Sequence, residues 1–451
     1  MSGGGENLQS LSESLIAAAR KAGADQADAL AVHGRSISID MRGGALEQAD
    51  SAEGLEIGLR VLIGGRQACV SASDHSPDSI REMAERAVAM AREAPSDDNL
   101  GLADPGQLAA RRDASGLPIA DDRPDPDPAD LQELALRAEA AARAQPGITQ
   151  VESASAAFSR RHLWLAASNG FSGGYQRSSH MISAVAITGE GLGMERDYAA
   201  EARIWAAELP APEEIGHLAA SRTLARAGSQ KPPTGAFPIL FDQRVSASLI
   251  GHLLSAVNGT AIARGASWLR KALGEPVLPA GMDLSEDPLK PRYPSTRPFD
   301  AEGLPTRPRS IVQDGVLQGW TLDLATGRKL GMDSTGSAAR GLASAPAPSI
   351  SNVMLSPGTQ SRDELIAQMG RGLIVTSMLG ASINETTGDY SRGAAGFWVE
   401  NGQIVWPVNE CTIAGNLRDM LMTLRAADDP LPWRATRVPS LLVEGMTVAG
   451  A

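Results

Sequence analysis

The nitrogen and sulfur side chains that most often bind zinc are scarce in this 451-residue chain, which has only six histidines and two cysteines. No two histidines lie within four residues of each other, so neither HExxH nor HxH spacing occurs. The cysteines, Cys69 and Cys411, are too far apart to indicate a zinc ribbon or a disulfide framework. We predict ordinary packed or surface histidines and two reduced thiols. The histidines are His33, His75, His162, His180, His217 and His252.

The most informative segment is residues 241–259, FDQRVSASLIGHLLSAVNG, which predicts a helix over 242–257. Asp242 can cap this helix, and Asn258 followed by Gly259 can end it. An apolar stripe at helical spacing runs through Val245, Leu249, Leu253 and Ala256. On this pattern alone, His252 beside the stripe is a packed histidine without a catalytic role.

The elements that must position this helix divide the chain into two parts. Residues 1–230 have the order helix, strands, helix twice, which suggests an internal repeat of 1–95 and 128–228. This part predicts a mixed α/β domain with a mostly antiparallel sheet. Residues 96–127 are rich in Asp, Pro and Gly and predict a surface loop, and residues 228–234 predict a linker.

The second part, residues 235–451, predicts a β-rich domain of antiparallel hairpins. Asp314-Gly315 and Asn401-Gly402 each separate two strand-like runs, and both dipeptides favour two-residue hairpin turns. One short helix is expected from Ser361 to about Met369, because Ser361 and Glu364 have capping-box spacing. The overall fold class is therefore predicted to be α+β.

The composition limits the partners and the location of the protein. Its net charge of −12 and pI near 5.1 argue against a broad surface for nucleic acid or for anionic membranes. The N-terminus lacks the basic and apolar regions of a secretory signal, and no apolar run reaches the roughly 18–20 residues of a membrane span. We therefore expect a cytoplasmic protein.

The segment at 241–259 resembles the helix that carries the HExxxH motif in TldD-type proteins, where two histidines bind zinc and the glutamate activates water. Matching Gly251-His252 to the end of that motif places Ala247 at the first histidine and Ser248 at the glutamate. Of the three functional positions, this chain keeps only His252. Neither alanine nor serine is a good zinc ligand, and a serine hydroxyl does not ionise near neutral pH.

The spacing of that motif has a structural consequence as well. Positions five apart on an α-helix diverge by about 140°, so an active HExxxH needs a wider π-type turn. This chain has no metal to stabilise such a bulge. We therefore predict no catalytic residue and no metal ligand in it.

The resemblance to the TldD/PmbA metalloprotease family extends over essentially the whole chain, and it is to the PmbA (TldE) branch. The matching segments are SLIGHLLSAVNG, STRPFDAEGLPT, RKLGMDSTGSA, TGDYSRGAAGFWVENG (387–402), VWPV, TIAGNL and the terminal MTVAGA. The family implies a heteromeric protease whose TldD-like subunit supplies zinc and the catalytic glutamate. The PmbA-like chain would enclose unfolded or small peptides, including leader peptides, as its structural partner, or would self-associate as a homodimer.

A loop in the β-rich domain is the candidate for contacting such peptides. Asp389, Tyr390 and Arg392 lie among glycines there and could line the cavity, since a peptide can pair with a sheet edge. The alternative is that Gly388, Gly393 and Gly396 only permit tight turns and that Arg392 forms a structural ion pair.

Two other functions remain open at this point. One is a homo-oligomeric peptide-binding or scaffold protein without a protease role. The other is a hydrolase with Cys411 as nucleophile, which the lack of a nearby histidine in the sequence disfavours.

Overall fold

The structure is a computed structural model that describes residues 3–450. Its first part contains one six-stranded antiparallel sheet, in the order β3-β2-β1-β4-β5-β6. The strands are β1 (Gln26–Arg42), β2 (Ala45–Ile63), β3 (Arg66–Ala72), β4 (Ile148–Ala167), β5 (Ser172–Thr188) and β6 (Glu195–Arg203). The helices are α1 (Gly3–Ala22), α2 (Pro77–Glu93), α3 (Pro128–Arg143) and α4 (Pro212–Leu224).

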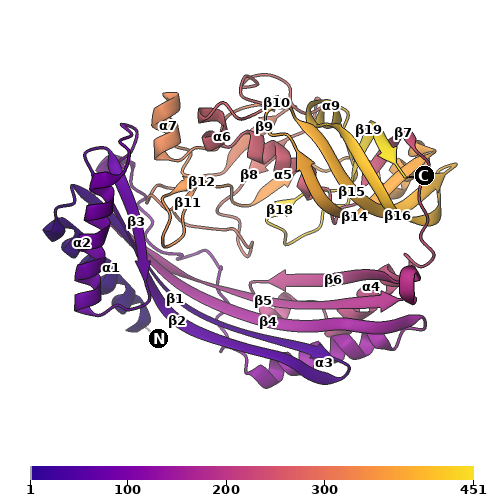
Figure 1. Cartoon of the computed structure of the whole chain (residues 1–451), viewed down its shortest axis with the longest axis horizontal. Helices are drawn as coiled ribbons and strands as arrows, with labels where there is room; N and C mark the ends of the chain where they lie inside the picture. The colour runs from indigo at the N-terminus through magenta and orange to yellow at the C-terminus, as the bar shows by residue number, and fades with distance from the viewer. Residues whose placement is uncertain (1–2, 451) are drawn as a thin grey trace.

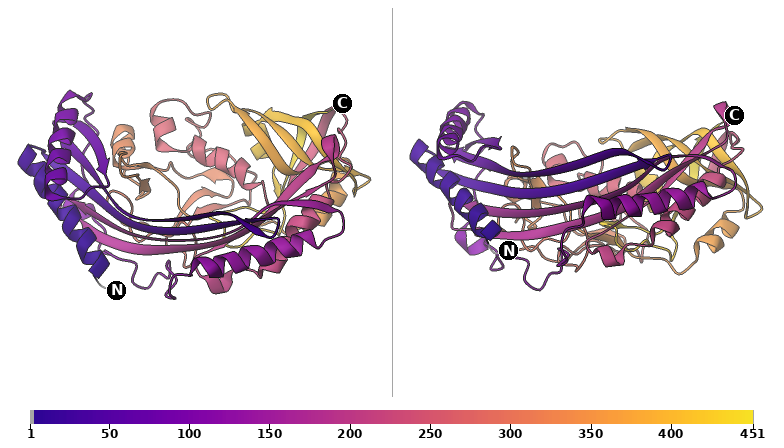
Figure 2. Two further views of the ribbon diagram at one scale, coloured as in Figure 1. Left: turned by 60° about the horizontal axis from the view of Figure 1, so that its bottom comes forward. Right: turned by 90° about the horizontal axis from the view of Figure 1, so that it is seen from below.

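The long strands have different environments on their two faces because side chains alternate along a strand. In β1, Ala27, Ala29 and Ala31 pack into the core beneath α1 and α2, and Ile37 and Ile39 pack beneath α3. The intervening residues point to the other face of the sheet. The curved sheet thus carries one helix pair at each end of its outer face, and the second domain lies over its inner face (Figures 1 and 2).

The second domain is built around a closed sheet in the order β16-β15-β14-β7-β19-β17, in which β16 also pairs with β19. Because of that pairing, β7, β14, β15, β16 and β19 form a barrel. All its pairings are antiparallel except that of β14 with β7. The strands are β7 (Gly235–Phe241), β14 (Gly372–Ile383), β15 (Asp389–Glu400), β16 (Gln403–Asn416), β17 (Arg425–Ala426) and β19 (Leu441–Ala449).

Short elements complete this domain around the barrel. A second sheet has the order β10-β9-β8-β13-β18, and β11 pairs with β12. These strands are β8 (Leu284–Glu286), β9 (Arg309–Gln313), β10 (Val316–Leu317), β11 (Ala338–Ala339), β12 (Ala347–Pro348), β13 (Val353–Leu355) and β18 (Thr436–Arg437). The helices are α5 (Ala247–Ala256), α6 (Gly259–Ala263), α7 (Leu324–Leu330), α8 (Arg362–Met369) and α9 (Leu417–Met422).

The predicted α+β class and several local features are confirmed. Asp314-Gly315 joins β9 to β10 and Asn401-Gly402 joins β15 to β16, with positive φ at all four residues. Ser361 forms the expected capping box with Glu364 at the start of α8. The order helix, three strands, helix also occurs twice along the first part.

Two predictions about local structure were only partly correct. Residues 96–127 are not simply a surface loop, because Leu102, Ala109 and Ile119 are buried and the segment hydrogen-bonds to the second domain. Its apolar residues pack although its composition is polar. The helix predicted over 242–257 is regular only as α5, because Asp242 opens a tight turn instead of capping the helix.

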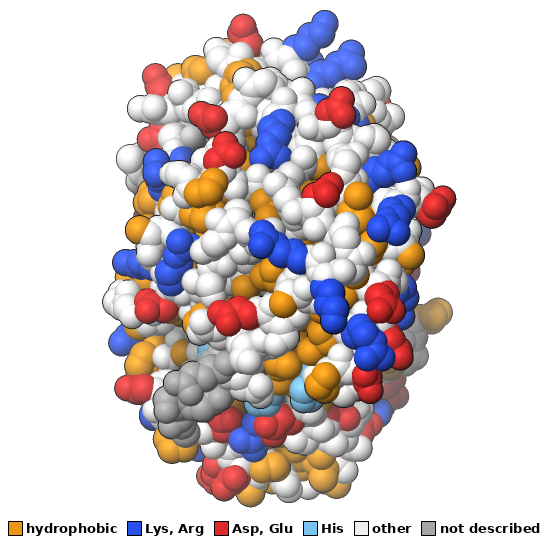
Figure 3. All heavy atoms as spheres, turned by 90° about the vertical axis from the view of Figure 1, so that its left-hand side faces the viewer, with side chains coloured by type: hydrophobic (Ala, Val, Ile, Leu, Met, Phe, Trp, Pro, Cys, Tyr) orange, Lys and Arg blue, Asp and Glu red, His pale blue; other side chains and the backbone are white. Residues whose placement is uncertain are grey.

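The surface of the first domain has mixed charge. On the face with α1 and α2, basic and acidic side chains are interspersed without a broad patch of one sign (Figure 3). Within residues 3–450, every helix is too short or too polar to cross a lipid bilayer.

Candidate functional site

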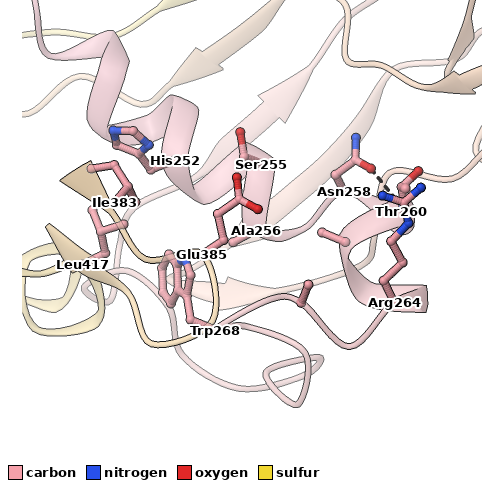
Figure 4. A pocket seen from close by; sticks show the side chains of 12 residues that line it. His252, Ser255, Ala256, Asn258, Thr260, Arg264, Trp268, Ile383, Glu385 and Leu417 are labelled. Carbon is pink, nitrogen blue, oxygen red and sulfur yellow. Dashed lines mark hydrogen bonds between the residues drawn. The ribbon is translucent and has the colours of Figure 1, made fainter. Parts of the chain in front are cut away.

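His252, the residue matched to the last histidine of the HExxxH motif, lines a cavity of about 460 Å³ beside the barrel (Figure 4). The cavity is formed by the end of α5, by α6, by the segment that follows α6, and by the tip of the β14–β15 hairpin. Its polar lining consists of His252, Ser255, Asn258, Thr260, Arg264 and Glu385, and its largest apolar wall is Trp268.

The position of α5 is determined by its apolar residues and by the turn before it. The carbonyl oxygen of Asp242 accepts hydrogen bonds from the amides of Val245 and Ser246, at 2.8 and 2.9 Å, and so starts the coil before the regular helix. Leu249 and Leu253 are fully buried against the barrel. This packing leaves the His252 side of the helix toward the cavity.

The three motif positions do not converge on one point. Ala247 packs against the hydrophobic core, while His252 lines the cavity. The Ser248 hydroxyl donates to the carbonyl oxygen of Val245 at 2.7 Å, within its own turn. The divergence agrees with the rotation of about 140° over five residues of a regular helix. Restoring the missing side chains would therefore not by itself assemble a ligand set.

His252 is held by an aromatic contact and not by a hydrogen bond at its Nε2. Its ring lies edge-to-face against Tyr390, with centroids 5.8 Å apart. Among residues 3–450, the buried Nε2 has no hydrogen-bond partner. Burial lowers the pKa of His252, and the positive charge of Arg392 lowers it further. The imidazole is therefore neutral at physiological pH.

The three residues predicted to contact substrate lie at the start of β15, but only one reaches the histidine. Tyr390 is buried against His252, and its hydroxyl donates to Sδ of Met378 at 3.4 Å. Asp389 is exposed and accepts hydrogen bonds from Thr387 and Asn416, which lower its pKa. That these residues bind substrate stays a prediction.

The alternative interpretation of this loop is partly correct. Gly388 has a φ of +86°, and a Cβ at Gly396 would lie 1.8 Å from the carbonyl oxygen of Ile374, so both positions need glycine. The suggested ion pair of Arg392 does not form within the described residues. Its Nε donates instead to the carbonyl oxygen of Gly380 at 2.7 Å, across the hairpin.

Sequence reasoning missed Glu385, Trp268 and Arg264, which line the same cavity as His252. The amide of Trp268 donates to the carbonyl oxygen of Glu385 at 2.9 Å and ties the hairpin tip to the segment after α6. The only local signal was Asn384, which accepts hydrogen bonds from two following amides in an Asx turn. That signal predicts the turn, but it does not predict what the turn lies against.

A metal centre does not fit the residues present around α5. His252 is the only imidazole in the cavity lining, and Ala247 and Ser248 supply no ligand beside it. Across residues 3–450, no three His, Cys, Asp or Glu side chains lie close enough together to hold an ion. We derive no metal-dependent step for this chain.

Cys411 is poorly placed to act as a nucleophile. It is 5% exposed on β16, and its thiol donates to the carbonyl oxygen of Ala394 at 3.1 Å. Burial raises the pKa of Cys411 to about 11. The thiol is therefore protonated near neutral pH, and the reactive thiolate is scarce.

Comparisons with known proteins identify the family of the chain. Family models of the PmbA/TldA metallopeptidase match three regions: domain 1 at residues 27–91, the central domain at 121–227 and the C-terminal domain at 234–450. The chain is 35% identical to the metalloprotease PmbA of Escherichia coli O157:H7, over 92% of this chain and 90% of that protein. It is also 35% identical to the metalloprotease PmbA homolog of Haemophilus influenzae, over 96% and 94% of the two chains.

A solved structure shows the same fold. TldE from Thermococcus kodakarensis aligns with a TM-score of 0.83 over 98% of this chain and 100% of that one, at 20% identity. The resemblance inferred from the motifs is thus confirmed by both the sequence and the fold. The chain belongs to the PmbA/TldD metallopeptidase family, as a PmbA-like member.

Proposed function

We propose that this chain is the non-catalytic subunit of a cytoplasmic zinc metallopeptidase whose TldD-like subunit supplies the metal and the catalytic glutamate. The observation that supports this most directly is the geometry of α5. Ala247 faces the core, Ser248 bonds to its own turn, and His252 alone reaches the cavity. Nothing in this arrangement can activate water on a metal.

The role that remains is to form part of the enclosure for unfolded or small peptides, leader peptides included. The tip of the β14–β15 hairpin and the cavity beside His252 belong to the barrel domain. The curved sheet lies beneath that domain (Figure 1). Main-chain pairing with a sheet edge would accept extended peptides of many sequences. Such an enclosure needs shape and rigidity and no reactive group.

The test is to purify this chain alone, and also together with the TldD-like protein of the same organism, and to assay cleavage of an unfolded peptide. We expect a stable complex with chelator-sensitive activity and about one zinc per pair, and neither zinc nor activity in the isolated chain. A matched control replaces the motif glutamate of the TldD-like subunit with glutamine, which should abolish cleavage and leave the complex intact.

Chelator-sensitive cleavage by this chain alone would overturn the proposal. So would peptide binding by a homo-oligomer that never associates with the TldD-like protein, which is what a scaffold without a protease role would show. Light scattering of the single chain and of the mixture separates these outcomes.

A further inference from the structure

A second cavity, of about 340 Å³, lies where the two domains meet, on the side of Figure 1 where β6 and α4 approach the barrel. The first domain contributes residues of β6 and α4. The second domain contributes the turn after β7, the start of α8, and residues of β14 and β15. The polar residues that line it are Asp197, Ser221, Arg222, Asp242, Gln243, Arg244, Arg362 and Thr376.

The three guanidinium groups in this cavity differ in their ion pairs. The Arg244 guanidinium holds Asp197 through two contacts of 2.5 and 3.1 Å. Nε of Arg362 lies 3.2 Å from a carboxylate oxygen of Asp242, although without hydrogen-bond geometry. Arg362 also lies 3.7 Å from Asp363, an exposed carboxylate outside the lining. Of the three guanidinium groups that line the cavity, only that of Arg222 has no carboxylate of residues 3–450 within ion-pair distance.

Arg222 lies on α4. Within residues 3–450 it forms no ion pair, and its guanidinium donates to the carbonyl oxygen of Tyr198 at 3.0 Å. Burial lowers the pKa of Arg222 and the neighbouring charge of Arg244 lowers it further, and the charges of Asp197 and Asp242 offset this only in part. A partly buried guanidinium that is repelled by a like charge is stabilised by an anion beside it.

Thr376, another residue of the lining, has an orphan hydroxyl. Thr376 is only 7% exposed, and its Oγ1 has no hydrogen-bond partner among the described residues. The residue lies at an irregularity in β14, where the pairing with β15 shifts between Val375 and Ser377. Buried hydroxyls almost always have a partner, so an unsatisfied one beside an unpaired guanidinium points to an absent acceptor.

We propose that this cavity binds a small oxyanion whose oxygens accept hydrogen bonds from Arg222 and from the Thr376 hydroxyl. A single guanidinium without a carboxylate partner suits a phosphate monoanion or a carboxylate. The site is separate from the His252 cavity, and the proposal does not depend on a catalytic partner. Two sources can provide the anion: inorganic phosphate and the terminal carboxylate of a peptide.

The course of β14 makes the peptide carboxylate a serious candidate. β7 pairs with β14 only at residues 373–375, so the following residues have no β7 partner. The strand then runs from Thr376 at this cavity to Ile383 at the His252 cavity, about 23 Å at the usual rise per residue. A peptide anchored here by its carboxylate could extend along β14 toward His252.

The experiment is isothermal titration of the full chain, in phosphate-free buffer, with inorganic phosphate and with N-acetyl-dialanine as free acid and as amide. The Arg222→Gln variant removes the unpaired charge. The Thr376→Val variant removes only the hydroxyl and keeps the side-chain shape, so it should fold. Arg137→Gln on the exposed surface of α3 is the matched control.

We expect at least one oxyanion to bind, with affinity reduced about tenfold or more in Arg222→Gln, several-fold in Thr376→Val, and unchanged in the control. Thr376→Val should also raise the melting temperature of the free chain, because it removes the orphan hydroxyl. Binding of the free acid but not of the amide identifies a carboxylate site, and binding of phosphate alone identifies a phosphate site. The proposal is overturned if neither inorganic phosphate nor the free acid of N-acetyl-dialanine binds. It is also overturned if Thr376→Val leaves the affinity unchanged.

Discussion

Arg340 of the second domain forms a buried ion pair with Asp28 of β1, although 312 residues separate them in the chain. The two side chains are 1% and 3% exposed. Arg60 on the neighbouring strand β2 contacts the other carboxylate oxygen of Asp28, at 2.5 and 2.6 Å. One carboxylate thus holds two guanidinium groups at the junction of the domains.

Replacing Asp28 with asparagine should therefore be strongly destabilising. The amide keeps the shape but removes the carboxylate that pairs with Arg60 and Arg340. Breaking a buried ion pair in this way should lower the free energy of unfolding by about 3–5 kcal/mol. Urea unfolding at pH 7 measures the change. As a control, Asp78→Asn breaks an exposed pair with Arg81 on α2 and should leave the midpoint unchanged. A midpoint for Asp28→Asn equal to that of wild type would show that the junction does not depend on this pair.

The raised pKa of Glu302 predicts that the folded protein loses stability as the pH rises. It is 8% exposed beside Asp300, and burial first, then the Asp300 charge, raises the pKa of Glu302 to about 8. An acid whose pKa is higher in the folded state binds its proton more tightly there, so the folded state is favoured below the unfolded pKa near 4.3. This stabilisation decreases between about pH 5 and 8, by at most about 1.4 kcal/mol per pH unit from this group.

The matched variant is Glu302→Gln, which resembles the protonated acid permanently. Unfolding free energies measured from pH 5 to 8.5 should fall more steeply for wild type than for the variant. Parallel curves would mean that Glu302 is ionised in the folded protein.

The lowered pKa of His252 predicts the opposite pH dependence, a loss of stability as the pH falls. Burial and Arg392 lower the pKa of His252 in the folded state, so the unfolded chain binds the proton more tightly. Stability from this group is complete above the unfolded pKa near 6.5 and decreases as the pH falls below it. His252→Leu keeps an apolar contact with Tyr390 and should lose less stability than wild type between pH 7 and 5. If the free energies of unfolding of wild type and variant differ by the same amount at pH 5 and at pH 7, the assignment of a neutral, buried imidazole is contradicted.

The double variant Ala247→His with Ser248→Glu tests whether composition or geometry is the obstacle to metal binding. The new histidine would enter at the position that now packs against the core, on a different side of α5 from His252. We expect lower thermal stability and far less than one zinc per chain after dialysis, measured by elemental analysis. Stoichiometric zinc would show that α5 readily widens into the π-type turn that the motif needs.

The sequence by itself determined the features that depend on neighbouring residues. The hairpins at Asp314-Gly315 and Asn401-Gly402 follow from the low cost of positive φ at these residues, and the start of α8 follows from the capping box of Ser361 and Glu364. The family resemblance also predicts which motif positions are missing, since that needs only residue identities. The α+β class followed from the periodicity of apolar residues.

Only the tertiary structure decided which distant residues meet. The contact of His252 with Tyr390 and the ion pair of Asp28 with Arg340 depend on packing between segments more than a hundred residues apart. So does the burial of apolar residues in 96–127, where local composition indicated an exposed loop. Local hydrogen bonds and dihedral preferences carry no information about such pairs, because their free energy comes from burial that exists only once the domains have packed.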